Sequence, residues 1–247
     1  MRALLEAELV KLRTTRTFIA LTASAVGISL LITVLVASIT EPTQEDVLND
    51  VFNSDVSGLF ILILAIIGIT GEWRHRTITS SLLASPDRLR FLAAKTIAFA
   101  VAGALLSLLI SIAIGIAGYV ILSARDLPTP ELGDLLERFA RNAELAALLG
   151  ALGLALGSLI RNQPTAIVGV LVLSLVIEPA VIALAPDVGR FLPFSGLSAS
   201  IQAIPGENIG ADDVDLLSPG FGALVMLVWI AVPFVAGVVM LRRRDLN

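Results

Sequence analysis

The sequence predicts an all-α membrane protein, a single transmembrane domain over residues 1–247 with six transmembrane helices. Three observations predict this fold class. Apolar residues make up 56% of the chain and charged residues only 15%, whereas soluble domains average about 45–50% and about 25%. Six weakly charged stretches are long enough to cross a bilayer, and basic residues gather on alternate connections between them. A soluble globule could not cover so much apolar surface, which disfavours a soluble enzyme, a nucleic-acid-binding domain and a disordered chain.

The first element is an amphipathic segment over residues 1–16. Leu5, Leu9 and Leu12 recur at i, i+4 and i+7, and the positions between them are largely polar, so we expect an interfacial elbow helix lying along the inner membrane surface. The alternative is a plain charged flank of the first span. The uncharged stretch that follows, 17–39, has 23 residues, more than the usual 7–15 of a signal-peptide core. It is therefore expected to be a retained span.

Six spans follow from length and charge. A bilayer core of about 30 Å needs about 20 apolar residues at 1.5 Å per residue. Irregular backbone cannot face lipid, so each span is expected to be a helix. The second span has only 16 uncharged residues between Asp55 and Glu72, and it must use flanking residues or lie in thinned lipid. The expected spans are residues 17–39, 56–71, 96–124, 142–160, 164–186 and 216–241.

The basic residues set the orientation. With both termini in the cytoplasm, 13 of the 17 Lys and Arg residues fall on the cytoplasmic side, which satisfies the positive-inside rule. The first outer connection is acidic instead. The sequence therefore predicts a multi-pass protein with both termini cytoplasmic. The basic residues left outside are Arg125, Arg138, Arg141 and Arg190.

The longest cytoplasmic connection, residues 72–95, has its own pattern. Residues Thr77–Ala84 are expected to form a short helix, with Ile78, Leu82 and Leu83 on its apolar edge. Ser85 suits an N-cap and Pro86 a first helical position, so the third helix is expected to begin inside the cytoplasm. A short helix held between two spans can transmit a push to both. The alternative is a solvated basic loop.

Two features mark the outer side of the fifth span. Glu178 is a carboxylate within a span, which is expensive and usually functional or near water, and Pro179 is expected to break the helix there. A role in gating or in the substrate path is one interpretation, and a simple helix end is the other. In the outer connection 187–215, a short re-entrant or interfacial helix is expected near 194–203, either as a lid or packed against span ends.

Four segments of the chain carry a recognisable combination of motifs. They are Glu72, His75, Thr77, Leu82, Leu83, Pro86, Arg88 and Ala93-Ala94-Lys95, then Glu8-Leu9 with Lys11-Leu12-Arg13, then Gly157 to Asn162, and the final Arg242 to Leu246. Together these motifs resemble the permeases of type-2 ABC exporters, particularly the short bacterial ones. The likeness covers essentially the whole chain, and Arg76 stands where the family pattern has glycine.

The resemblance implies a half-transporter in the bacterial cytoplasmic membrane. The chain would pair with a second copy of itself or a paralogous permease, among membrane lipids. Each permease would rest on a cytosolic ATP-binding cassette ATPase subunit, which binds ATP and Mg. Neither lysine of this chain follows a Walker A loop, as expected if a separate chain hydrolyses the ATP. The implied ATPase-coupling contacts are Lys11, Arg13, Glu72, Arg76, Thr77, Leu82, Leu83, Pro86 and Arg88.

The rare residues argue against other chemistry. The chain has no Cys and one His, His75, so we expect no catalytic site, no metal site and no cofactor in this chain, and no nucleic-acid partner. The alternative function is a stand-alone ion-coupled transporter or channel. It would need ionisable groups within the membrane, of which only Glu178 qualifies, and no inverted repeat is evident.

Overall fold

The computed structural model describes residues 2–44, 46–75, 77–78, 87–160, 162–203 and 215–243. All regular structure in this part of the chain is helical, and six helices are long and apolar enough to cross a membrane. The predictions of an all-α fold and six spans are confirmed. The helices are α1 Arg2–Thr14, α2 Arg16–Ile39, α3 Val47–Asp50, α4 Ser57–Arg74, α6 Arg88–Ala124, α7 Leu132–Leu159, α8 Gln163–Val172, the π-helical turn η1 Leu173–Ile177, α9 Glu178–Leu184, α10 Pro186–Gly189, α11 Gly196–Gln202 and α12 Pro219–Arg243.

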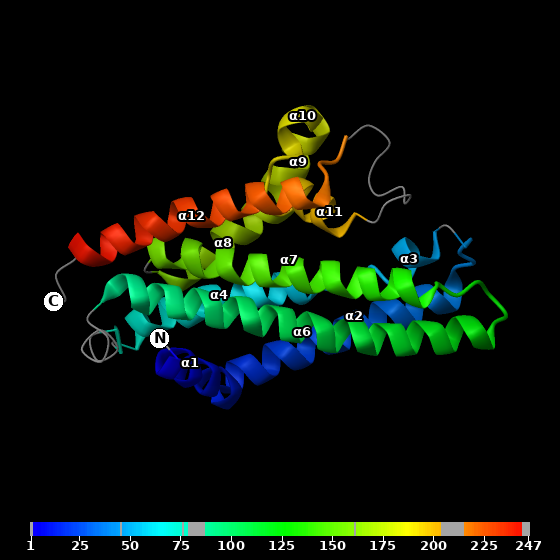
Figure 1. Cartoon of the computed structure of the whole chain (residues 1–247), viewed down its shortest axis with the longest axis horizontal. Helices are drawn as coiled ribbons and strands as arrows, with labels where there is room; N and C mark the ends of the chain where they lie inside the picture. The colour runs from blue at the N-terminus through cyan, green and yellow to red at the C-terminus, as the bar shows by residue number, and fades with distance from the viewer. Residues whose placement is uncertain are drawn as a thin grey trace.

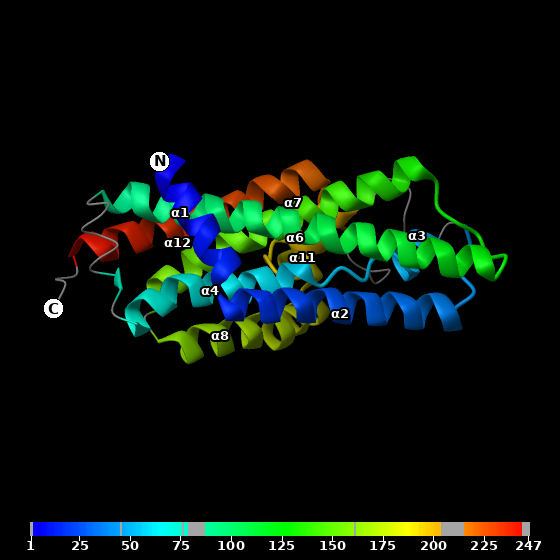
Figure 2. The same cartoon turned by 90° about the horizontal axis from the view of Figure 1, so that it is seen from below.

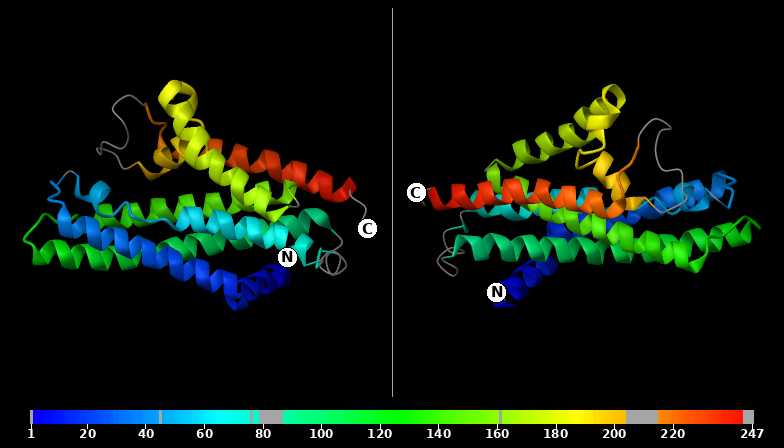
Figure 3. Two further views of the ribbon diagram at one scale, coloured as in Figure 1. Left: turned by 180° about the vertical axis from the view of Figure 1, so that it is seen from behind. Right: turned by 45° about the horizontal axis from the view of Figure 1, so that its top comes forward.

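The spans form an elongated bundle in which α7 is central. It packs against α4, α6 and α12, while α2 lies along α6 and α4. The two termini lie at one end of the bundle, as an even number of spans requires, and α3 lies at the other (Figure 1). The fifth span, made of α8, η1 and α9, leaves the bundle at an angle (Figure 3), and most of its residues are exposed.

Glycines allow the closest approaches within the bundle. A Cβ atom on Gly150 would lie 2.6 Å from the carbonyl oxygen of Phe99 in α6, and one on Gly153 would lie 2.5 Å from that of Leu62 in α4. Backbone cannot give way as a flexible side chain can. Small residues at these seams therefore set the helix spacing, as is common in membrane bundles.

The third and fourth helices extend beyond the predicted spans. The described part of α6 begins at Arg88, and its N-cap is Asp87, whose Oδ1 accepts bonds from the backbone N of Leu89 and Arg90 at 3.1 and 3.3 Å. Asp87 thus has the capping role predicted for Ser85, which lies outside the described residues. In the fourth span the helix begins at Leu132, not at 142. Its outer turns carry Arg138, whose charged side chain is buried in the protein, and a search for uncharged stretches does not detect such turns.

The fifth span does not break at Pro179, contrary to the prediction. Pro179 lacks a backbone N–H and cannot make the usual bond to the carbonyl four residues before it. The chain widens into the π-helical turn η1 just before this proline and then resumes as α9. A π-turn of this kind accommodates a local defect while the helix continues.

Candidate functional site

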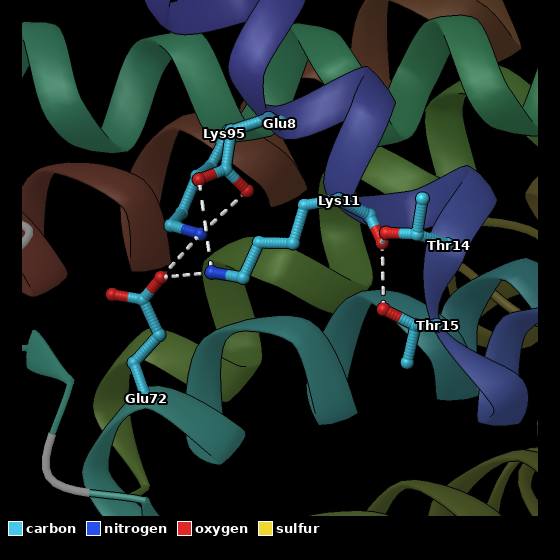
Figure 4. Close-up of polar contacts among 6 residues, drawn as sticks. All are labelled: Glu8, Lys11, Thr14, Thr15, Glu72 and Lys95. Atoms are coloured by element: carbon cyan, nitrogen blue, oxygen red, sulfur yellow. Dashed lines mark hydrogen bonds and ion pairs between the residues drawn. The ribbon is translucent and has the colours of Figure 1, made fainter.

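Four charged side chains meet at the end of the bundle where the termini lie, and we call them the ionic cluster: Glu8, Lys11, Glu72 and Lys95. Figure 4 shows Glu8 and Lys11 on α1, with Glu72 and Lys95 reaching them from α4 and α6. The Nζ of Lys95 lies 2.7 Å from Oε2 of Glu8 and 2.8 Å from Oε1 of Glu72. The Nζ of Lys11 lies 2.7 Å from the same Glu72 oxygen. The cluster therefore joins three helices.

Local structure places these side chains. Glu8 and Lys11 are three residues apart on α1 and so share one face of that helix. Glu72 lies in the last turn of α4, and Lys95 lies about two turns into α6. The Phe91 ring, one turn before Lys95, has its centroid 5.3 Å from Nζ, within the range of a cation–π contact.

The cluster is buried on the side of the bundle and open on the side of α1. The side chains of Lys95 and Glu72 are only 1% and 2% exposed, whereas that of Lys11 is 51% exposed. Two cations and two anions balance, which is the condition for burying charge at tolerable cost. Among the described residues, no donor reaches Oε2 of Glu72.

Lys11 remains a cation in this setting. Burial lowers the pKa of its amine, but the hydrogen bond to Glu72 and the negative charges of Glu72 and Glu8 outweigh burial and leave the pKa above 10.5. The Lys11 ammonium therefore stabilises the folded state at all pH values below 10.5. The ionic cluster holds α1 against α4 and α6.

A cleft with a volume of ≈ 390 Å³ opens beside the ionic cluster. It lies between α1, the start of α2, the last turns of α4 and the start of α8, which lie close together at this end of the bundle (Figure 2). One part of its wall is apolar and another part is charged or polar. The residues that line it include Leu12, Phe18, Leu64, Ile67 and Phe99, and Lys11, Glu72, Arg74 and His75.

The predicted coupling residues that the structure describes lie in three places. Lys11 and Glu72 meet directly, and the backbone N–H of Thr77 donates to the carbonyl of Glu72 at 3.0 Å. Arg88 lies apart, where its Nε donates to the carbonyl of Leu241 in α12 at 3.0 Å. Arg13 lies near the end of α1.

The remaining coupling residues, Arg76, Leu82, Leu83 and Pro86, lie outside the described residues. So does most of the predicted Thr77–Ala84 helix. Ile78, which the structure describes, is only 5% exposed and packs with Phe91 and Leu92 in an apolar cluster. The start of this segment is therefore held against the bundle.

Sequence reasoning missed Glu8 and Lys95 as members of one site. A signal was available in the rarity of lysine, because the chain has only Lys11 and Lys95. A rare cation beside the apolar residues of a span needs a buried anion, and Glu72 directly follows the predicted second span on the cytoplasmic side. Sequence spacing alone could not show that α1 crosses both helices.

Glu178 ties the fifth span to the start of α11. Its side chain is fully buried, and Oε2 accepts bonds from the backbone N–H groups of Phe194 and Ser195, both at 2.8 Å. No donor in the described part of the chain reaches its Oε1. Pro179 is exposed. Glu178 therefore anchors the fifth span to the segment before α11, within a helix that continues to Leu184, and its role in gating stays a prediction.

A second polar network, also missed from the sequence, lies toward the opposite end. Asp55, just before α4, accepts bonds from the hydroxyls of Ser107 and Ser111 at 2.6 and 3.1 Å. The amide of Asn142 donates to the Ser111 hydroxyl, and the amide of Gln202 donates to Asn142. Burial raises the pKa of Asp55, although its hydrogen bonds act in the opposite direction. The network links the start of α4 to α6, α7 and α11.

The buried guanidinium of Arg138 extends this region. It donates to the carbonyl of Gln202 at 3.0 Å and to Oδ1 of Asn49 at 2.9 Å. A buried arginine needs such acceptors, because its charge cannot be removed. These bonds explain why charged turns belong to α7.

Comparison with known proteins adds no family to this geometry. No protein-family model matches the chain, and no curated protein matches it.

Proposed function

We propose that this chain is the transmembrane permease subunit of an ATP-binding cassette exporter. It moves a substrate outward across the bacterial cytoplasmic membrane, using ATP hydrolysed by a separate ATPase subunit. The observation that carries the proposal is the ionic cluster. It joins α1 to the last turn of α4 and the first turns of α6, the two helices that flank the connection 75–87. A force applied to α1 or to that connection is therefore passed to the second and third spans.

The coupling between the ATPase subunit and the spans depends on the stiffness of the ionic cluster. Separating Lys95 from Glu72 would leave buried charge uncompensated, which costs several kcal/mol, so the three helix ends move together. Lys11 and Arg13 lie on α1, Glu72 and Arg88 lie on the helices that flank the connection, and the remaining coupling residues lie within it. ATP binding shifts the inward-open and outward-open states only by its differential affinity for them. The ATPase subunit supplies that difference, with its ATP and Mg.

A second permease is the expected partner within the membrane. The fifth span exposes large apolar side chains, among them Leu175 at 65% and Val176 at 60%. Lipid or a second copy of the chain, or a paralogue, would cover them. Crosslinking in native membranes distinguishes a paired permease from a single chain.

The test of the proposal is coupling to an ATPase. The reading frames beside the gene are searched for a protein with a Walker A loop, the chain is co-expressed with that protein, and co-purification and ATP hydrolysis in proteoliposomes are measured. Leu83→Asp is expected to reduce permease-dependent stimulation of hydrolysis at least tenfold, because it places a charge on the apolar edge of the expected coupling segment. The matched control is Leu132→Asp, at the opposite end of the bundle, where Leu132 is 72% exposed. Full vectorial transport by the chain alone would contradict the proposal.

An ion-coupled transporter is the second candidate, and Asp55 favours it. This carboxyl is buried among serine hydroxyls and has a raised pKa, so it can take up and release a proton. The test is proton flux into liposomes that contain the purified chain alone, followed with an enclosed pH-sensitive dye. Flux that Asp55→Asn abolishes would support this candidate, and no flux would leave the exporter proposal standing.

A further inference from the structure

The cleft beside the ionic cluster combines two kinds of wall. Leu64, Ile67 and Phe99 line one part, while Arg74 and His75, at the end of α4, line another. Leu64 precedes Arg74 by ten residues, which is about 15 Å along a helix. Because α4 is a span, its apolar positions lie at the depth of acyl chains and Arg74 lies at the depth of headgroups. The cleft therefore changes from apolar to polar along the direction in which a lipid does.

The charges in the cleft favour an anion. Glu8 and Glu72 are balanced by Lys11 and Lys95 within the ionic cluster. Arg74 is exposed and has no ion partner among the described residues. After the four cluster charges cancel, one permanent positive charge remains at the polar end. A phosphate group complements it, since guanidinium and phosphate pair through two parallel hydrogen bonds.

The cleft is open at Gly71, which also lines it. A Cβ atom on this glycine would meet nothing within 4 Å, whereas one on Gly153 would meet backbone. A Cβ atom at position 71 can therefore project into the cleft without displacing a neighbouring helix.

We propose that this cleft binds an anionic glycerophospholipid, with the phosphate on Arg74 and the upper acyl chain against Leu64 and Ile67. A volume of ≈ 390 Å³ falls in the range of small-molecule sites and suits a headgroup with the first part of a chain. A purely polar ligand would leave the apolar wall uncovered, and a purely apolar one would desolvate Arg74 without a partner. The inference depends on the membrane insertion of α4 and not on the exporter function.

The test uses the full-length chain purified in detergent, with phosphatidylglycerol, phosphatidylcholine and sn-glycerol 3-phosphate as probes. Binding is measured by native mass spectrometry and by the shift in thermal unfolding. Phosphatidylglycerol is expected to bind the wild type at least tenfold more tightly than phosphatidylcholine does. sn-Glycerol 3-phosphate is expected to bind at least tenfold more weakly than phosphatidylglycerol, because it lacks acyl chains.

Two variants and two controls complete the design. Gly71→Leu fills the cleft and is expected to weaken phosphatidylglycerol binding at least tenfold, while Gly169→Leu, also at an open glycine but on α8 away from the cleft, is expected to leave it unchanged. Arg74→Gln is expected to remove the preference for phosphatidylglycerol. Arg90→Gln is its control, because Arg90 is 73% exposed, pairs with Asp87 and lies outside the cleft.

Three results would overturn the proposal. The first is equal binding of both lipids to the wild type. The second is undiminished phosphatidylglycerol binding by Gly71→Leu, and the third is an unchanged lipid preference in Arg74→Gln. The Arg74→Gln arm keeps the proposal testable if the Gly71 variant fails to fold.

Discussion

The Nζ of Lys95 lies 2.8 Å from Oε1 of Glu72, and neither side chain is more than 2% exposed. This pair is the buried half of the ionic cluster, and Lys11 closes it from the exposed side. The two lysines therefore contact one carboxylate oxygen from environments that differ greatly in solvation. Their substitutions should have unequal effects.

Lys95→Met is expected to lower the free energy of unfolding by about 3–5 kcal/mol, because it leaves buried carboxylates without their main cation. Lys11→Met, at a half-exposed position, is expected to cost no more than about 1 kcal/mol. Reversible unfolding in mixed detergent micelles measures both. Adding Glu72→Gln to Lys95→Met should restore part of the loss, and equal losses for the two single variants would argue against a buried pair.

Gly153→Leu is expected to destabilise the bundle by about 1–3 kcal/mol or to prevent folding, because its side chain would meet the backbone of α4 at Leu62. Gly169→Leu is the matched control. Both changes replace a helical glycine by the same residue, but nothing lies within 4 Å of a Cβ at position 169. Thermal unfolding of the purified proteins compares them. Similar melting temperatures would show that α7 and α4 are not in close contact at this seam.

Glu178→Ala is expected to cost about 2 kcal/mol, because it leaves the backbone N–H groups of Phe194 and Ser195 without their acceptor. Glu178→Gln keeps an amide oxygen in place and should lose much less. Hydrogen exchange of these two amides, followed by mass spectrometry, is the measurement. The anchor interpretation fails if both variants exchange as slowly as the wild type. Lost transport in Glu178→Gln with unchanged exchange would indicate a gating role.

Asp55 should make stability depend on pH with a defined sign. Burial raises its folded-state pKa above the ordinary value of 3.8, so the folded protein holds the proton more tightly than the unfolded chain does. The contribution of Asp55 to stability is therefore full below pH 3.8 and is lost as pH rises from there through the folded-state pKa.

Asp55→Asn removes this titration, and its free energy of unfolding should fall less between pH 4 and pH 7 than that of the wild type. Detergent unfolding at a series of pH values measures the difference. The control is Asp187→Asn, at a side chain that is 93% exposed, which should follow the wild-type curve. An Asp55→Asn curve parallel to the wild type would contradict the assignment.

The six spans were predictable because their signal is a bulk property. Runs of apolar residues longer than a bilayer core leave few alternatives to helices. The outer turns of α7 were not predictable in this way. Arg138 makes them unfavourable in lipid, and contacts with Asn49 and the Gln202 carbonyl, both distant in sequence, stabilise them in the protein.

The candidate site was predictable in part for a similar reason. Lys11 and Glu72 were selected by pattern and resemblance, and the structure brings them together. Their partners Glu8 and Lys95 required the crossing of α1 over α6, which is a tertiary relation between helices far apart in the chain. The helix break predicted at Pro179 was wrong, because the π-helical turn η1 accommodates the proline and the helix continues as α9.

The engagement of both lysines in one cluster has a practical consequence. An acylating reagent added to the folded protein meets the half-exposed amine of Lys11 but not that of Lys95, which is 1% exposed. Modification of Lys95 requires α1 to lift from the two helices beneath it. The rate at which the Lys95 amine is acylated would therefore report how often α1 separates from α4 and α6, without an engineered probe in the chain.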